Sequence, residues 1–238
     1  MGRIFAVCSG NGGVGKSMIA LSLAIGAAKA GCQTILLDAS GTPRSCDLIL
    51  GMESVVTLDM ADVLKNQISI ASALYTVPRH EGLRFACASL YDSIPASDLA
   101  GVVLALQTLC DVLVVDMATG QTDPGGIGIM KQGDEHLFVV RPDDVSIRAT
   151  ERVIDHSSRN QSGISLVINR ASRERVKRKT QYDQNTVQAV LDRMIAGCIP
   201  EDPGIAEAER RGKAAIESDG PAKAALQSMI KRLLNSAM

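Results

Sequence analysis

Eight consecutive residues near the amino terminus have the types and spacing needed to hold a polyphosphate. Residues 10–17 read Gly-Asn-Gly-Gly-Val-Gly-Lys-Ser and match the pattern G-x-x-x-x-G-K-[ST]. Glycines let backbone N–H groups turn toward a phosphate, because a positive φ has no steric cost for them. Lys16 has the charge and length to reach the β- and γ-phosphates, and the Ser17 hydroxyl is a Mg²⁺ ligand. The nucleotide-binding residues predicted here are Gly10, Asn11, Gly12, Gly13, Val14, Gly15, Lys16, Ser17 and Met18.

Two carboxylates follow apolar runs that have the length of buried strands. Asp38 directly follows Thr34–Leu37, and Asp116 directly follows Val112–Val115. A carboxylate at the end of a strand beside a phosphate loop is placed to face Mg²⁺. An aspartate that caps the next helix gives the same local pattern, so this alternative stays open for both residues. The predicted metal ligands are Ser17, Asp38 and Asp116.

The scaffold for these residues can be predicted from short apolar runs that alternate with helix-like stretches. Several runs are apolar at consecutive positions, which is typical of strands buried on both faces of a parallel sheet. The pattern predicts one α/β domain over residues 1–238, with a doubly wound, mainly parallel sheet of about seven to eight strands and helices on both faces. Ligands of such sheets bind at the carboxyl ends of the strands. The predicted strands are Ile4–Cys8, Thr34–Leu37, Leu83–Ala88, Val112–Val115, Leu137–Val140, Ile164–Ile168 and Ile195–Ile199, and the predicted helices span residues 16–30, 59–66, 96–109, 145–158, 184–193 and 221–235.

Composition excludes several classes of protein. Hydrophobic residues make up 46% and charged residues 21% of the 238-residue chain, which excludes a disordered chain. Aromatic residues make up 3%, too few for a protein that stacks single-stranded nucleic acid on aromatic rings, and the net charge of −1 excludes a strongly basic DNA-binding domain. The six cysteines are scattered without a C-x-x-C pair, as expected for reduced thiols rather than ligands of a metal cluster. No apolar run approaches the roughly 20 residues that span a bilayer.

Together, the motifs resemble those of the MinD/ParA family of P-loop ATPases. Besides the loop and the two aspartates, residues 44–51 (Arg-Ser-Cys-Asp-Leu-Ile-Leu-Gly) are similar to the MinD stretch R-x-x-D-L-x-x-G. Residues 116–120 (Asp-Met-Ala-Thr-Gly), 167–170 (Val-Ile-Asn-Arg) and 199–202 (Ile-Pro-Glu-Asp) follow in the family's order. The resemblance extends over nearly the whole chain, and its order and spacing are more specific than any single motif.

The resemblance implies an activity and a site. Family members bind ATP, dimerise face to face over the nucleotide, hydrolyse it slowly and position other machines in the bacterial cell. By resemblance, this chain is expected to bind ATP or ADP with Mg²⁺, to form a nucleotide-dependent homodimer and to have a protein partner. It is expected to be cytoplasmic, with recruitment to the membrane or a cell pole by partners. The residues that match the family's adenine site, where a plain turn at the strand ends is the alternative, are Asn169, Arg170, Pro200, Glu201 and Asp202.

Two positions depart from the family's motifs. The family's loop begins K-G-G-x-G-K, and its first Lys reaches the phosphates of the dimer partner, whereas this chain has Asn11. The family also has D-x-D after the second strand, whose second Asp orients the attacking water, and here the pair is Asp38 and Ser40. Asn11 brings no charge, and the loss of such a donor costs roughly 10²–10³ in rate. Lys16 and Asp38 remain as catalytic residues, so we expect nucleotide binding with very slow or absent hydrolysis.

Two functions of different classes are compatible with these residues. The first is an ATP-binding, nucleotide-gated positioning or scaffold factor, acting in cell division, in flagellar or pilus placement, or in cargo segregation. The alternative is an enzyme, either a competent slow ATPase or a small-molecule phosphoryl-transfer enzyme of the same fold. Mg²⁺-dependent turnover of ATP that is abolished by Lys16→Ala would favour the enzyme.

Two further segments bear on partners. Arg170–Lys179 contains six basic residues and one acid, and is either a solvated face or a contact surface for an anionic protein, lipid or DNA. The stretch Ala222–Leu234 has apolar residues on one helical face. We expect a helix packed on the core rather than a membrane-targeting tail, because the chain stops at Met238, where the last helix of the fold should end.

Overall fold

The structure is a computed structural model that describes residues 1–41, 45–65, 67–89, 96–120, 134–157 and 163–235. Arg44 of the motif above, and residues 66 and 158 at the ends of two predicted helices, lie outside this part of the chain. The described residues form an eight-stranded sheet in the order β3-β4-β2-β5-β1-β6-β7-β8. All neighbouring strands are parallel except β3 and β4. The strands are β1 (Arg3–Cys8), β2 (Thr34–Ala39), β3 (Tyr75–Thr76), β4 (Leu83–Cys87), β5 (Val112–Met117), β6 (Glu135–Val140), β7 (Ile164–Ala171) and β8 (Met194–Pro200).

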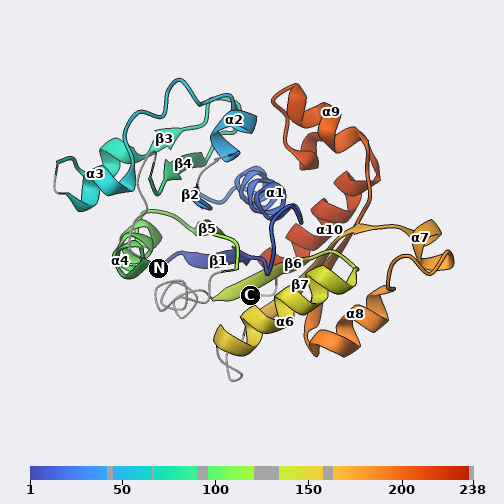
Figure 1. The fold of residues 1–238 in the computed structure, drawn as a ribbon. Coiled ribbons are helices and arrows are strands. Elements are labelled where there is room, and N and C mark those ends of the chain that lie inside the picture. Colours follow the sequence, from blue (N-terminus) through green and yellow to red (C-terminus); the bar gives the residue numbers. More distant parts are fainter. Residues whose placement is uncertain (42–44, 66, 90–95, 121–133, 158–162, 236–238) are drawn as a thin grey trace.

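Helices cover both faces of the sheet, as Figure 1 shows. Apolar residues of α1, α10 and the 3₁₀ helix η2 form one core layer, and those of α4, α6 and α8 form the other. The predicted doubly wound α/β fold is therefore confirmed. The helices are α1 (Lys16–Lys29), α2 (Cys46–Leu50), α3 (Met60–Leu64), α4 (Ala96–Gln107), α6 (Asp144–Ser157), α7 (Arg173–Lys177), α8 (Gln184–Leu191), α9 (Gly204–Arg210) and α10 (Pro221–Asn235), with 3₁₀ helices η1 (Ile70–Ala73) and η2 (Ala215–Glu217).

The seven predicted strands are all present, because their uninterrupted apolar runs fit a sheet covered on both faces. Every residue of β2 and β5 is buried. The elements that the sequence does not predict are short: β3 has two residues, α2 and α7 have five each, and α9 has seven. A segment of that length shows too few turns for its periodicity to be read.

The carboxyl ends of the parallel strands bring the candidate residues to one edge of the sheet. Asp38 in β2 and Asp116 in β5 are paired residues in the ladder, and Val7 of β1 pairs with Asp116 on its other side. The phosphate loop follows β1, and Asn169 lies in β7 on the same edge. Residues that are far apart in the sequence thus meet where parallel sheets bind ligands.

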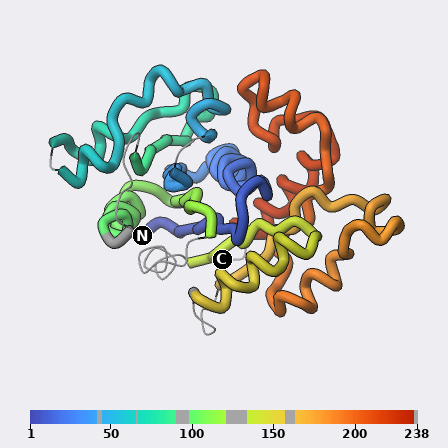
Figure 2. Tube along the Cα trace, viewed as in Figure 1, coloured from blue at the N-terminus to red at the C-terminus, as the bar shows by residue number. Residues whose placement is uncertain are grey.

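The helix α10 packs on the core, as predicted. Its buried residues include Leu226, Met229 and Leu233, and the tube in Figure 2 places this red segment beside the blue helix α1. The approach is close, because a Cβ added at Gly26 of α1 would lie 2.7 Å from Ile230 Cδ1. Within the described residues, no helix combines the length and the apolar character that a bilayer crossing requires.

Candidate functional site

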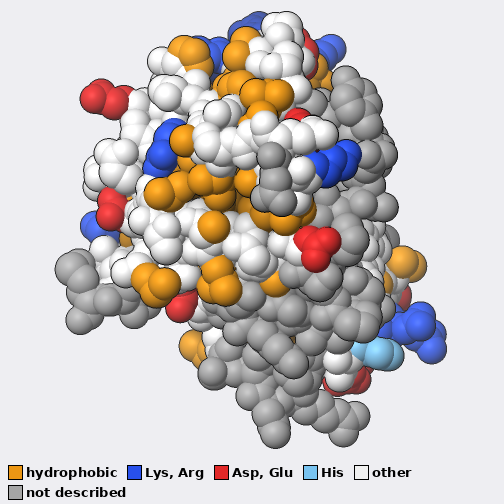
Figure 3. Space-filling view, turned by 90° about the vertical axis from the view of Figure 1, so that its left-hand side faces the viewer, with side chains coloured by type: hydrophobic (Ala, Val, Ile, Leu, Met, Phe, Trp, Pro, Cys, Tyr) orange, Lys and Arg blue, Asp and Glu red, His pale blue; other side chains and the backbone are white. Residues whose placement is uncertain are grey.

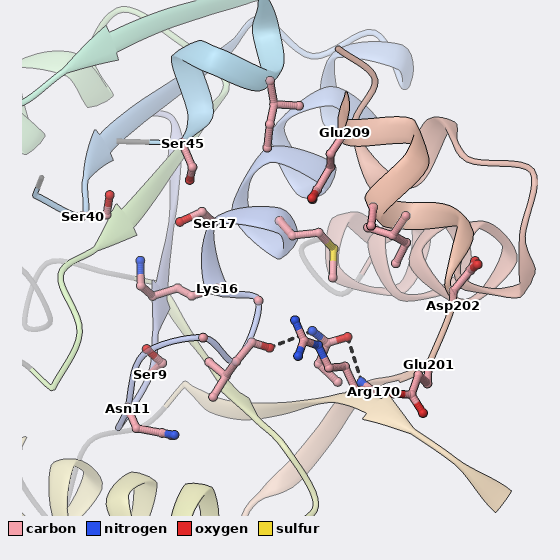
Figure 4. Close-up of a pocket in the computed structure, with 18 of the residues that line it drawn as sticks. Ser9, Asn11, Lys16, Ser17, Ser40, Ser45, Arg170, Glu201, Asp202 and Glu209 are labelled. Atoms are coloured by element: carbon pink, nitrogen blue, oxygen red, sulfur yellow. Dashed lines mark hydrogen bonds between the residues drawn. The ribbon is translucent and has the colours of Figure 1, made fainter. Parts of the chain in front are cut away.

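A cavity of about 810 Å³ opens at this edge of the sheet, a volume within the range of small-molecule sites. Figure 4 shows Lys16 and the three serines Ser17, Ser40 and Ser45 at one end of it, and Arg170, Glu201 and Asp202 at the other. We name these the phosphate end and the base end, after the groups that the sequence analysis predicts they bind. The cavity is lined by Ser9, Asn11, Gly13, Val14, Gly15, Lys16, Ser17, Met18, Ser40, Ser45, Ile49, Thr119, Asn169, Arg170, Pro200, Glu201, Asp202, Pro203, Ile205, Ala206 and Glu209.

The phosphate loop owes its shape to two glycines with left-handed backbones. Gly13 has φ 74° and Gly15 has φ 94°, and α1 begins directly after Gly15 without a side-chain cap. The uncapped first turn leaves backbone N–H groups and the positive end of the helix dipole facing the cavity, which favours an anion. Gly10 is required for a different reason: an added Cβ there would lie 2.3 Å from the backbone of Ala149 in α6, so there is no room for a side chain.

Lys16 and Asp116 form a buried ion pair at the phosphate end. Lys16 Nζ lies 2.5 Å from Asp116 Oδ1, and both side chains are buried. Burial raises the pKa of the Asp116 carboxyl, while the charge of Lys16 and hydrogen bonds from Lys16 and Ser17 act to lower that pKa. The pair satisfies two charges that would each be costly to bury alone. The Lys16 ammonium has three N–H donors, so it can donate to a phosphate beside this contact or in place of it.

Asp38 faces the same place with one carboxylate oxygen anchored and the other unpartnered. Its Oδ1 accepts hydrogen bonds from the Ser40 backbone N at 3.0 Å and from Ser40 Oγ at 2.6 Å. Its Oδ2 is buried and has no hydrogen-bond partner among the described residues. A buried carboxylate oxygen that accepts no hydrogen bond is costly, and a bound cation would compensate that cost. Asp38, Asp116 and the Ser17 hydroxyl therefore fit a divalent cation, and the three predicted metal ligands are brought together.

Cys46 of α2 joins these carboxylates. Its Sγ donates to Asp116 Oδ2 at 3.8 Å, and ligand atoms of Asp38, Cys46 and Asp116 all lie within 4.8 Å of one another. Burial raises the pKa of the Cys46 thiol well above its ordinary value, and the negative charges of Asp38 and Asp116 raise it further. The sequence analysis missed Cys46, because no second Cys or His stands near it at ligand spacing.

At the base end, Asn169 ties β7 to the phosphate loop. Its Nδ2 donates to the Val14 carbonyl at 2.7 Å, and its Oδ1 accepts from the Arg170 backbone N at 2.9 Å, as the dashed lines in Figure 4 show. Gly15 is packed against it, because an added Cβ would lie 2.3 Å from Asn169 Nδ2. Arg170 follows with φ 56° and lines the cavity.

The turn Pro200–Asp202 lines the cavity, and two of its side chains have structural partners. Asp202 Oδ1 accepts from the Gly204 backbone N at 2.9 Å, and Asp202 Oδ2 accepts from the Ala222 backbone N at 3.1 Å. This carboxylate therefore holds the starts of α9 and α10. Glu201 forms an exposed ion pair with Arg175 of α7 at 3.1 Å.

Glu209 of α9 is a charged lining residue that the sequence analysis missed. Its carboxyl points into the cavity in Figure 4, where burial raises its pKa and the charge of Arg170 acts to lower that pKa. The segment Gly204–Arg210 gives no signal in the sequence, because a single large apolar residue, Ile205, cannot establish a helical period.

The fold and the loop together define a P-loop nucleoside triphosphatase domain. The ParA family model, described as "NUBPL iron-transfer P-loop NTPase", matches residues 1–234. The chain belongs to this ParA/MinD family, which confirms the resemblance drawn from the motifs. Its members include septum site-determining proteins MinD. The words "iron-transfer" belong to the description of the family model, and the six cysteines of this chain are free thiols.

Similar proteins include septum site-determining proteins MinD. That of Helicobacter pylori (strain ATCC 700392 / 26695) is 30% identical over 245 residues, covering 98% of this chain and 91% of that protein. That of Escherichia coli (strain K12) is 29% identical over 248 residues, covering 98% and 92%. Among solved structures, MinD in the MinC:MinD complex of Aquifex aeolicus has a TM-score of 0.88 at 28% identity, with 98% and 96% of the two chains covered. The Mg-ADP complex of MinD from Pyrococcus horikoshii, at 22% identity, has a TM-score of 0.87 and covers 100% and 98%.

Proposed function

We propose that residues 1–238 form a single nucleotide-binding domain that holds Mg²⁺ and ATP or ADP in this cavity. The observation that carries the proposal is the arrangement of the cavity: an uncapped helix start with Lys16 and Ser17 lies at one end, and Asn169 and Arg170 lie at the other. A nucleotide needs this combination of an anion site and a base-sized recess in one cavity. The residues proposed to contact the base are Asn169, Arg170, Pro200, Glu201 and Asp202.

The phosphate end supplies the groups that a bound nucleotide requires. Lys16 would leave Asp116 and donate to the β- and γ-phosphates, while the loop amides hold the remaining phosphate oxygens. Ser17, Asp38 and Asp116 would hold Mg²⁺, which neutralises charge on the phosphates when bound. Asp116 then exchanges one cation for another, so its buried charge stays compensated in both states.

The same geometry supports very slow or absent hydrolysis. Asn11 brings no charge to the phosphates, and the loss of a charged donor costs roughly 10²–10³ in rate. Ser40 has an additional defect, because its hydroxyl donates to Asp38 at 2.6 Å instead of being held out toward a water molecule. Nucleotide binding depends on Lys16 and Ser17, which both line the cavity. A bound nucleotide would therefore hold the protein in one state and would be hydrolysed slowly or not at all.

We infer a role as a nucleotide-gated positioning or scaffold factor that acts as a homodimer with a protein partner. The MinD relatives support this role by family, and cell division, flagellar or pilus placement and cargo segregation are the candidate settings. Apolar side chains gather on the face that carries α3 and α4, as Figure 3 shows, where Leu64 and Leu104 are exposed. Such a face favours a protein partner. The basic segment Arg170–Lys179 would offer an anionic partner a second contact, and recruitment to the membrane or a pole would be indirect.

A single set of measurements tests the proposal against a competent ATPase. Molecular mass is followed with ADP, ATP and a non-hydrolysable ATP analogue while phosphate release is measured in the same samples. We expect a dimer with ATP or the analogue and little phosphate. Equal mass in all states would refute the nucleotide gate, and rapid Mg²⁺-dependent release that Lys16→Ala abolishes would favour the enzyme.

Restoring the missing groups gives the converse test. The double substitution Asn11→Lys with Ser40→Asp should raise the rate of ATP hydrolysis by about 10²-fold, because it returns a charge and a water-orienting carboxylate. Asn11→Gln is the matched control, since it lengthens the side chain without adding charge. An unchanged rate in the double variant would show that hydrolysis is limited elsewhere.

A further inference from the structure

Cys46, Asp38 and Asp116 surround one point at the floor of the phosphate end. The Cys46 Sγ to Asp116 Oδ2 distance is 3.8 Å, and the ligand atoms of all three residues lie within 4.8 Å of one another. In a tetrahedral site with Zn–S near 2.3 Å and Zn–O near 2.1 Å, the sulfur and oxygen ligands are about 3.6 Å apart. The Cys46 and Asp116 side chains thus already stand near the separation that a thiolate and carboxylate site requires, and a ligand oxygen of Asp38 lies within 4.8 Å of both.

Each carboxylate has one oxygen fixed by a neighbour and the other directed to this point. Asp116 Oδ1 is held by Lys16, which leaves Oδ2 toward Cys46. Asp38 Oδ1 is held by the hydroxyl and the backbone N–H of Ser40, which leaves Oδ2 buried and unpartnered within the described chain. Ligands anchored by second contacts in this way are oriented before the metal binds.

The charges around this point favour a cation. Two buried carboxylates face one ammonium group, that of Lys16, so among these three residues one negative charge is uncompensated. Ser17, Ser40 and Ser45 line this end of the cavity, as Figure 4 shows, whereas the cluster residues themselves are buried and are not among the lining residues.

We propose that Asp38, Cys46 and Asp116 form a cation site with a thiolate ligand, which selects a thiophilic divalent ion such as Zn²⁺ over Mg²⁺. Mg²⁺ takes oxygen ligands in near-octahedral geometry, whereas a thiolate prefers zinc-like ions. The inference shares two carboxylates with the proposed function, yet it requires no nucleotide. Binding exchanges one bond for another: the S–H bond of Cys46 breaks, a sulfur–metal bond forms, and the proton leaves to solvent.

Cadmium binding to the nucleotide-free protein tests the site, because the bond between Cd²⁺ and a thiolate absorbs in the ultraviolet. The parent protein carries Cys32→Ser, Cys110→Ser and Cys198→Ser, which removes the three partly exposed thiols. Cd²⁺ titration should give the thiolate band with one equivalent of metal, Zn²⁺ should displace Cd²⁺, and Mg²⁺ in large excess should not. Adding Cys46→Ser should abolish the band and lower Cd²⁺ affinity by about 10–100-fold.

Cys87→Ser is the matched control, since it removes another buried thiol that contacts the Ser89 carbonyl and leaves the cluster intact. Asp38→Asn provides a second variant with nearly unchanged shape, and it should also weaken Cd²⁺ binding. A band that persists in Cys46→Ser, or Mg²⁺ that displaces Cd²⁺ at comparable concentration, would overturn the proposal. Mg²⁺–ADP binding to the same proteins separates the two claims: Cys46→Ser should bind Mg²⁺–ADP as the parent does, and a parent that binds Cd²⁺ through Cys46 but no ADP would refute the nucleotide site alone.

Discussion

The two ends of the cavity differ in what their polar side chains are bonded to. At the phosphate end, Lys16 and Asp116 are bonded to each other, side chain to side chain, in a buried pair. At the base end, Asn169 and Asp202 are bonded to backbone groups of the loop and of the helix starts. Both ends line the same cavity, so this difference does not follow from proximity to a ligand.

Because of this difference, we expect the two ends to contribute differently to ligand affinity and to the free energy of unfolding. A buried ion pair can exchange its partner for a phosphate or a metal ion at little cost, since each charge stays compensated. A side chain that is hydrogen-bonded to two backbone groups cannot leave them without leaving a backbone donor or acceptor unsatisfied. Substitutions at the phosphate end should therefore act mainly on ligand affinity, and those at the base end mainly on the free energy of unfolding.

The largest expected effect is that of Lys16→Ala on nucleotide affinity. Mg²⁺–ADP affinity should fall about 100-fold or more, because truncating one member of a buried charged contact costs about 2–5 kcal/mol. The loss of stability should be smaller, since burial already raises the pKa of Asp116 and favours its protonation once Lys16 is gone. Calorimetric titration measures affinity, and urea unfolding measures stability.

Lys29→Ala is the control for this substitution. Lys29 lies in the last turn of the same helix, half exposed, with Glu217 at 3.5 Å. Lys29→Ala should change neither the affinity for Mg²⁺–ADP nor the stability to urea by much. Equal losses of affinity in the two variants would show that the phosphate end does not depend on Lys16.

Next in size is Asp202→Ala, which should destabilise the protein by about 2–3 kcal/mol. The substitution leaves the N–H groups of Gly204 and Ala222 without acceptors, and each of these two bonds to a half-buried carboxylate contributes about 1–1.5 kcal/mol net. Nucleotide affinity should change only a few-fold under conditions where the variant is folded. Asp219→Ala is the control, because Asp219 is exposed and its contact to Lys223 is long at 3.8 Å. A large loss of affinity without destabilisation would reverse the assignment of the base end.

The sequence predicted the central sheet and the phosphate end because both rest on local patterns. Uninterrupted apolar runs indicate the buried strands. Asp38 and Asp116 follow two of these runs and the loop with Lys16 follows a third, so all three residues lie at the carboxyl edge of the sheet. Contacts between residues of different elements at the sheet edge, such as those of Cys46 and Asp202, leave no pattern in the local sequence. The position of Cys46 beside Asp116 depends on how α2 folds back over the strand ends, and the partners of Asp202 depend on where α10 begins. Spacing in the chain encodes neither.

Asn169 of the base end is bonded to the phosphate loop, so Asn169→Ala should lower both the free energy of unfolding and the affinity for Mg²⁺–ADP, each moderately. Losing the hydrogen bond to the Val14 carbonyl and the acceptor for Arg170 N should cost about 1–2 kcal/mol of stability. Mg²⁺–ADP affinity should fall up to about tenfold, because the loop beside Gly15 loses its support. The exposed Asn185→Ala serves as control. If stability falls while affinity is unchanged, the loop holds its shape without β7, and the two ends are independent.

The smallest expected effect is that of Arg175→Ala, which breaks the ion pair with Glu201 at 3.1 Å. Although Glu201 lines the cavity, both side chains of this pair are more than a third exposed, at 51% and 38%. Exposed pairs contribute about 0–1 kcal/mol, because water solvates the separated charges nearly as well. Arg178→Ala, which breaks the more exposed pair with Glu174 on the same helix, is the matched control. Both variants should unfold within about 0.5 kcal/mol of the parent and bind Mg²⁺–ADP equally well. A selective loss of nucleotide affinity in Arg175→Ala would mean that Glu201 must be held by α7 to contact the base, and that a side-chain ion pair contributes to binding at the base end as well.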